Sequence, residues 1–341
     1  MLGQKVKPDP GSLDRQRALQ MRSAVGRKGR AFAVAAAIGL VAVACTPGTQ
    51  DGQRATAGQG EGEAPTNSEL LAKPFFLDLE TGEATLLPES LEGGDSYVAS
   101  PDGTRVAFVR SGTGGAIKIA NIDGTDVRTL PPPPEGFEDI EPRWSPDGTR
   151  IVYQERFADD DDVGNLFVYD LSTGERTQIT DLELRRSWHY DLWPSFSHHA
   201  DDEVIFHMAR TSGDTGTADV WFVPATGGEP RLLLENAWYP MTNPSPALGD
   251  MFAFQFLLPS ADLASTSIVA GHPCCPARRQ TLVEANESIW WPTMSPDGDS
   301  IAYQDDESIY VLDISTREVS EVGIGSTAEW LDNDTLIVVP R

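Results

Sequence analysis

From residue 73 onward, short runs in which apolar and polar side chains alternate follow one another at close intervals. Turn residues separate the runs. An alternation with a period of two residues is typical of strands that bury one face. No long stretch repeats apolar residues every three to four positions, which is the spacing of a helix packed on a core. The pattern therefore predicts an all-β protein over residues 73–341.

Three of these runs surround the same four-residue turn, Ser-Pro-Asp-Gly, which begins at Ser100, Ser145 and Ser295. Proline presets φ at the second position of a type I turn, aspartate bonds the local backbone, and glycine suits the last position. Residues of high β propensity lie on both sides, such as Trp144 before the second copy and Ile151 after it. Each copy predicts a tight hairpin, which we call an inner hairpin.

A second kind of hairpin, the outer hairpin, alternates with the first. Its clearest copies span residues 76–86 and 168–179. Weaker outer copies are found at 119–130, 221–233, 267–283 and 311–322, and weaker inner copies at 195–206, 245–254 and 329–339. Equivalent inner positions recur at intervals of 36 to 52 residues. That is the period of propeller blades with four strands each.

The two ends of this region complement each other. An outer hairpin at 75–87 comes first, and an inner hairpin at 330–339 comes last. Neither forms a blade alone, but together they complete a sixth blade and leave no open edge strand at the seam. We predict a six-bladed β-propeller of four-stranded antiparallel blades over residues 73–341, with the ring closed by a composite blade from the N- and C-terminal hairpins.

The three Ser-Pro-Asp-Gly hairpins resemble the blade repeat of TolB-like propellers. The resemblance covers residues 73–341 and is strong in three blades. It implies a six-bladed ring, an exported location and usually a protein-binding role. Similar blades also occur in the propeller domains of serine peptidases and in some sugar lyases.

The N-terminal region has the features of an export signal. An uncharged run of Ala and Val at 31–44 follows the basic residues 27–30 and ends at Cys45. Fourteen residues are too few to span a membrane and suit a signal peptide. The region resembles a bacterial lipoprotein signal, in which the cysteine is lipidated. The alternative is a plain secretory signal. Translation starts at either Met1 or Met21. We predict a signal peptide at 1–44, lipid attachment at Cys45, a disordered tether at 45–72 and anchoring on the extracytoplasmic face of a bacterial membrane.

The charge of the chain limits the classes of partner that it can bind, and its cysteine content limits the disulfides that it can form. The chain has 52 acidic and 26 basic residues, so its formal net charge is −26 and nucleic acid is an unfavourable partner. Three cysteines are too few for a disulfide scaffold. The adjacent Cys274 and Cys275 lie at the turn of an outer hairpin, where they form either a disulfide or two free thiols. We expect a monomer without a cofactor.

The long connections between hairpins, such as 154–165 and 180–193, lie on one face at the mouth of the central channel. Long loops on a rigid scaffold often carry binding sites. Aromatic residues and carboxylates gather there, and this mixture suits stacking on sugars or anchoring a basic peptide. The alternative is that the aromatics fill the joints between blades. The candidate ligand-binding residues are Glu141, Trp188, His189, Asp191, Trp193, Trp238, Tyr239, Trp290 and Trp291.

No serine-hydrolase elbow, phosphate-binding loop or zinc-protease motif is present. His198 and His199 are adjacent, so strand alternation turns them to opposite sides, and we expect no metal site. The leading hypothesis is a lipid-anchored, non-enzymatic propeller that binds an envelope protein or a cell-wall glycan. The alternative is a metal-assisted lyase or lactonase with its site at the channel mouth.

Overall fold

The computed structural model describes residues 64–340 except for several short internal segments, which are 111–114, 159, 183–187, 190–191, 198–201, 211–217, 236, 242–247, 249–251, 258–265, 273–274, 285–288 and 306. The predicted signal peptide, Cys45 and most of the predicted tether lie outside the described residues. No helix among the described residues is both long and apolar enough to cross a membrane.

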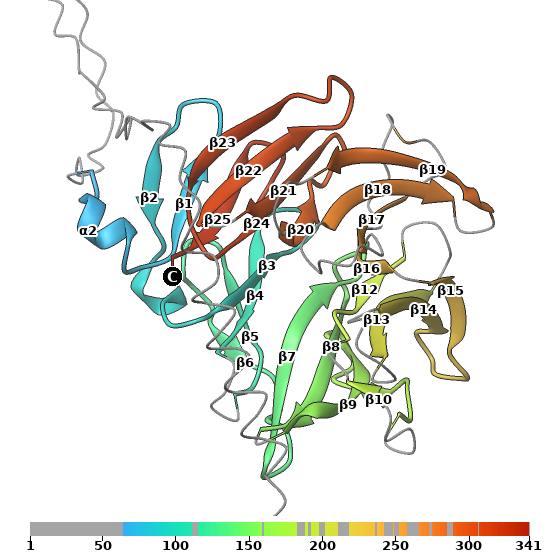
Figure 1. Cartoon of the computed structure of the whole chain (residues 1–341). Helices are drawn as coiled ribbons and strands as arrows, with labels where there is room; N and C mark the ends of the chain where they lie inside the picture. The colour runs from blue at the N-terminus through green and yellow to red at the C-terminus, as the bar shows by residue number, and fades with distance from the viewer. Residues whose placement is uncertain are drawn as a thin grey trace, which may run out of the picture. The chain divides into compact units, whose positions relative to one another are not determined.

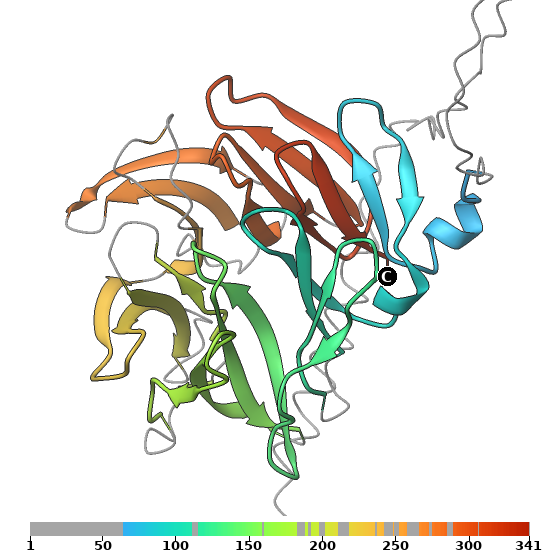
Figure 2. The same ribbon diagram turned by 180° about the vertical axis from the view of Figure 1, so that it is seen from behind.

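Six antiparallel sheets stand around a ring, and each is one blade (Figure 1; Figure 2 shows the reverse side). Blades 1 and 2 run from the channel outward as β3 (Ser96–Ala99), β4 (Arg105–Val109), β5 (Lys118–Asn121) and β6 (Arg128–Thr129), then β7 (Phe137–Trp144), β8 (Arg150–Phe157), β9 (Asp160–Asp170) and β10 (Arg176–Gln178). In blade 3, two short segments, β11 (Trp188–His189) and β12 (Ser195–Phe196), share the innermost place. Both pair with β13 (Glu203–Arg210), which is followed outward by β14 (Ala218–Pro224) and β15 (Arg231–Glu235). The predicted fold class is confirmed.

Blades 4 and 5 follow the same plan. Their strands are β16 (Ala237–Met241), β17 (Phe252–Leu257), β18 (Thr266–His272) and β19 (Cys275–Glu284), then β20 (Ile289–Met294), β21 (Ser300–Asp305), β22 (Ser308–Asp313) and β23 (Val319–Ile324). Blade 6 is the predicted composite of β24 (Thr327–Trp330), β25 (Thr335–Val339), β1 (Phe75–Asp78) and β2 (Ala84–Leu86). Because β1 pairs with β25, with Phe75 opposite Val338, the two ends of the domain close the ring in one sheet.

The repeated turns owe their shape to one local network. In the first copy, the hydroxyl of Ser100 donates to the carboxylate of Asp102 at 2.5 Å and accepts the N–H of Arg105 at 3.0 Å. The copies at Ser145 and Ser295 have the same two bonds. Glycine follows each aspartate with φ between 67° and 74°, a conformation that other residues adopt at a cost. Each turn therefore satisfies its own polar groups.

The apolar core lies between neighbouring blades. Ala107 of blade 1, for example, belongs to the same buried cluster as Ile151 of blade 2, and Val152 of blade 2 clusters with Phe206 of blade 3. The two faces of a middle strand thus serve two different joints, which explains the apolar character of strands such as β4 and β8 on both sides.

Two expectations about irregular segments were wrong. The predicted tether ends in a short helix, α2 (Asn67–Leu70), which a capping box of Thr66 and Glu69 stabilises. The predicted connection at 154–165 is largely strand, because β8 continues to Phe157 and β9 starts at Asp160. A 3-10 helix, η1 (Glu89–Leu91), joins β2 to blade 1.

Candidate functional site: the central channel

The innermost strands of blades 2 to 5 each contain an irregular residue followed by proline. These residues have left-handed φ values, which are rare for bulky side chains: Glu141 at 53°, Trp193 at 35°, Tyr239 at 44° and Trp291 at 52°. In blades 2, 4 and 5 the pairing register shifts at this place, which marks a β-bulge. In blade 3 the residue lies in the gap between β11 and β12. Proline fits a bulge because it has no N–H to donate to a neighbouring strand, and a bulge re-aims the side chains around it.

At or near three of the left-handed residues, a buried polar side chain of the preceding blade bonds the backbone. Gln154 accepts the N–H of Leu192 at 3.0 Å, just before Trp193. His207 accepts the N–H of Tyr239 on Nδ1 at 3.4 Å. Gln255 donates to the carbonyl of Ile289 at 2.7 Å, two residues before Trp291.

These supporting residues occupy one structural position, directly after the aromatic residue of the second strand. Blade 5 has Gln304 at this position although β24 of the next blade has no bulge, and Val109 of blade 1 precedes the bulge of blade 2. The polar support therefore accompanies the left-handed residue of the next blade in three of the four joints that have one.

The channel is lined by two rings to which every blade contributes one residue each. The turn-side ring consists of Val98, Arg143, Ser195, Met241, Thr293 and Glu329. Each of these residues lies two positions before the inner turn or directly after the proline that follows a left-handed residue. The loop-side ring, two residues earlier, consists of Ser96, Glu141, Trp193, Tyr239, Trp291 and Thr327. The first ring lines a chamber of about 230 Å³ and the second a chamber of about 160 Å³, which we call the turn-side and loop-side chambers.

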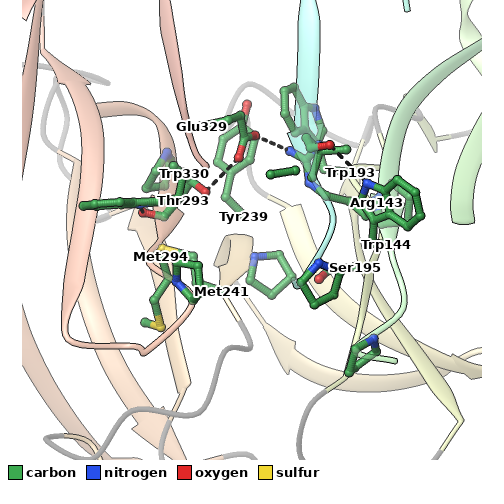
Figure 3. A pocket seen from close by; sticks show the side chains of 18 of the residues that line it. Arg143, Trp144, Trp193, Ser195, Tyr239, Met241, Thr293, Met294, Glu329 and Trp330 are labelled. Atoms are coloured by element: carbon green, nitrogen blue, oxygen red, sulfur yellow. Dashed lines mark hydrogen bonds and ion pairs between the residues drawn. The ribbon is translucent and has the colours of Figure 1, made fainter. Parts of the chain in front are cut away.

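An ion pair at the junction of the two chambers joins opposite parts of the chain (Figure 3). Nη2 of Arg143 lies 2.8 Å from Oε1 of Glu329, and Thr293 Oγ1 donates to the other carboxylate oxygen at 3.0 Å. Both charged side chains are only 19% exposed. Glu141 Oε2 lies farther from Arg143, at 4.0 Å. Because Arg143 and Glu329 line both chambers, the pair forms part of a constriction between them.

Three aromatic rings lie beside this ion pair, and two of them, Trp193 and Tyr239, line both chambers. The ring centres of Trp193 and Trp291 are 4.6 Å apart, and Tyr239 lies 5.1 Å from the first and 5.7 Å from the second. Tyr239 meets both tryptophans edge to face, at 79° and 66°, and the two tryptophan planes are tilted by 36°. The indole N–H of Trp193 is buried, and no acceptor for it is found among the described residues.

The turn-side chamber has a different lining. Met241, Met294 and several prolines line it, together with Trp144 and Trp330 (Figure 3). In contrast to Trp193, both of these tryptophans donate their indole N–H to a backbone carbonyl of a neighbouring blade at 3.1 Å.

The structure brings four of the predicted ligand-binding residues together in the loop-side ring: Glu141, Trp193, Tyr239 and Trp291. They lie on or beside the innermost strands, not in the inter-blade loops where we expected them. Trp290 lines neither chamber and is 46% exposed, so its role in ligand binding stays a prediction. The bulge turns its neighbour Trp291 inward instead.

Other predicted positions cannot be assigned to the site. Asp191, Cys274 and Cys45 lie outside the described residues. Only the backbone is described for Trp188 and His189 in β11, Trp238 in β16 and Cys275 in β19. The disulfide between Cys274 and Cys275 therefore stays a prediction, although β18 and β19 pair as antiparallel neighbours as expected.

The sequence reasoning missed Arg143 and Glu329, although counting back two residues from each inner turn would have found the ring that holds them. Among the described residues, no group of three or more His, Cys, Asp or Glu side chains could hold a metal ion.

No protein-family model matches the chain. Dipeptidyl-peptidase 5 of Porphyromonas gingivalis is 34% identical over 178 residues, which cover 47% of this chain and 23% of the peptidase. The chain thus spans about a quarter of the length of this curated relative. Among solved structures, a putative TolB from Agrobacterium tumefaciens (TM-score 0.56, 12% identity, 78% of this chain and 96% of that one) and an oligogalacturonate lyase from Vibrio parahaemolyticus (TM-score 0.52, 15% identity, 78% and 83%) have the same fold.

These comparisons correct one prediction. We expected a protein that is not an enzyme, but the relative in sequence is a peptidase and a neighbour in fold is a lyase. The missing catalytic motifs therefore did not justify the expectation of a protein without enzymatic activity. The architecture and its solved neighbours agree on the fold: the chain forms a TolB-like six-bladed β-propeller.

Proposed function

We propose that this protein is an exported propeller that binds part of an envelope protein or of a cell-wall glycan in its loop-side chamber. The observation that carries the proposal is the set of four left-handed residues, Glu141, Trp193, Tyr239 and Trp291, which all line one chamber. Left-handed φ at bulky residues costs free energy, and such strain is concentrated at functional sites. Aromatic side chains beside carboxylates are typical of binding hot spots.

Crosslinking in native envelopes tests this proposal. The wild-type protein and Trp193→Ala are expressed at equal levels, crosslinked and purified, and the covalent products are compared. We expect a defined product for the wild type and at least a tenfold lower yield for Trp193→Ala, because the variant removes a wall of the chamber. Equal yields would refute the chamber as the binding site.

The proposed location rests on Cys45 and the preceding apolar run. A lipidated cysteine would hold the propeller at the membrane surface, with the intervening residues as spacer. Metabolic labelling with a radioactive fatty acid should label the wild type and not Cys45→Ser. Labelling of both proteins, or of neither, would refute lipidation at this cysteine.

A second candidate is a metal-assisted lyase, which the fold shared with an oligogalacturonate lyase favours. Glu141 lines the chamber, while the side chains of His189 and Asp191 are not described. Incubation with oligogalacturonate and Mn²⁺ should then yield an unsaturated product that absorbs ultraviolet light. Glu141→Gln should abolish the formation of this product. No product with any divalent metal would refute this candidate.

A further inference from the structure

Among the described residues that line the loop-side chamber, acidic side chains outnumber basic ones. Of the described residues that line it, Asp95, Glu141 and Glu329 are acidic and only Arg143 is basic. The protein as a whole has a formal net charge of −26. Both the local and the long-range field therefore attract a cation and oppose an anion. An acidic sugar would have to compete with Glu329 for Arg143.

The aromatic wall also favours a compact cation. Trp193, Tyr239 and Trp291 stand next to Glu141 in consecutive places of the loop-side ring. A cation near the faces of such rings gains electrostatic stabilisation, most of all beside tryptophan. A sugar ring stacks best on one open, flat face, whereas these three rings pack on one another at inclined angles.

The buried indole N–H of Trp193 adds a requirement for an acceptor. A buried donor without a partner costs free energy, and a ligand that supplies a carbonyl oxygen removes this cost. The constriction of Arg143, Glu329 and the aromatic rings separates the two chambers, so the loop-side chamber suits the end of a chain better than its middle.

We infer that the loop-side chamber binds the N-terminal ammonium group of a peptide. Glu141 and the rings of Tyr239 and Trp291 surround the ammonium group, and the first carbonyl accepts the indole N–H of Trp193, whose ring already lies 5.8 Å from the guanidinium of Arg143. The inference rests on the proposed function and specifies its ligand.

Isothermal titration of the full-length protein at pH 7 tests it with trialanine and N-acetyl-trialanine. Acetylation removes the positive charge and keeps the rest of the peptide, so we expect at least a tenfold loss of affinity. This comparison uses only the wild-type protein and does not depend on the folding of a variant. Equal affinity for the two peptides, or no binding of trialanine at 10 mM, would overturn the inference.

Two variants locate the binding group. Glu141→Gln should weaken trialanine binding at least tenfold, while Glu135→Gln, which makes the same charge change on an exposed loop residue, should leave it unchanged. If both variants reduce affinity equally, only the overall charge acts, and the inference fails.

A third probe separates this inference from the proposed function. If trigalacturonate binds, and Trp193→Ala abolishes that binding while trialanine does not bind, the chamber is a glycan site. The peptide inference is then wrong and the proposed function stands. If Trp193→Ala leaves the binding of every probe unchanged, both are wrong.

Discussion

Blades 2 to 5 differ from blades 6 and 1 in what they present to the channel, although all six share one sheet plan. The innermost strands of blades 2 to 5 have a left-handed residue followed by proline, and they place Glu141, Trp193, Tyr239 and Trp291 in the loop-side ring. The regular strands β24 and β3 place only Thr327 and Ser96 there. The loop-side chamber is therefore walled by large side chains on one side and small ones on the other.

This difference teaches how a repeat protein acquires a site without a change of fold. The inner turns keep the same serine–aspartate network in blades 1, 2 and 5, whether or not the blade has a bulge. Strain at four positions, with polar support from the preceding blade in three, changes the direction of a few side chains. The scaffold at the turn end stays the same while the loop end diversifies.

The largest expected effect concerns Asp139, a buried carboxyl at a position where blades 4 and 5 have Ala237 and Ile289. Burial, and then the nearby Glu155, raise its pKa to about 7. The folded state then binds more protons than the unfolded state between about pH 4 and 7, so this group lowers stability as pH rises through that range. Asp139→Asn should therefore gain stability relative to the wild type between pH 5 and pH 8, by on the order of 4 kcal/mol at most.

Urea denaturation at pH 5 and pH 8 checks this. Asp102→Asn is the control, because hydrogen bonds from Ser100 and Thr104 lower the pKa of Asp102 to about 2. That carboxyl is ionised in both states at both pH values, so the effect of its replacement should not change with pH. A pH-independent effect of Asp139→Asn as well would show that Asp139 is ionised in the fold.

Next in size is the ion pair at the constriction. Arg143→Met leaves the carboxylate of Glu329 without its cation in a largely buried place, and we expect a loss of about 3 kcal/mol. The double variant with Glu329→Gln should recover more than half of it, since the uncompensated charge is gone. The free energy of unfolding of the wild type, Arg143→Met and the double variant tests this prediction. If the double variant is no more stable than the single one, the pair does not act as a unit.

A smaller effect is expected at the polar supports. His207→Leu removes the acceptor of the Tyr239 N–H and should cost about 2 kcal/mol. His207→Gln should keep most of the stability, because glutamine occupies the same place in blades 2, 4 and 5. Thermal unfolding at pH 7 compares them. Equal losses for leucine and glutamine would mean that packing, not the hydrogen bond, is what His207 contributes.

The smallest effect tests the strain itself. Asparagine tolerates left-handed φ better than glutamate, so Glu141→Asn should stabilise the fold by about 0.5 kcal/mol. Ser96→Asn in the regular strand of blade 1 should bring no such gain. Denaturant midpoints measured side by side would resolve the difference. An equal gain in stability at both positions would contradict the prediction, because it would show that the strained backbone of the bulge is not its cause.

The ring of blades could be predicted from the sequence because its signals are local. Ser-Pro-Asp-Gly encodes its own turn, and the order of hairpins at the two ends predicts the composite blade. The six inner and six outer hairpins therefore appear in the structure in their predicted order.

The site could be predicted only in part, for physical reasons. A bulge shifts the register by one residue, and strand alternation then no longer tells which of Trp290 and Trp291 faces the channel. The pair of Arg143 and Glu329 joins residues 186 apart in sequence, so it exists only once the ring is closed. The buried supports Gln154 and Gln255 each follow an aromatic residue, but the sequence does not indicate that they bond to the next blade.

The most direct test of the central claim compares the two adjacent tryptophans of β20. The claim is that the loop-side chamber binds the ligand, and only Trp291 lines it, whereas Trp290 is exposed outside it. The affinity of the full-length protein for its crosslinked envelope partner is measured for Trp291→Ala and Trp290→Ala. We predict at least a tenfold loss for Trp291→Ala and no change for Trp290→Ala. An equal loss in both variants, or a loss only in Trp290→Ala, would contradict the claim.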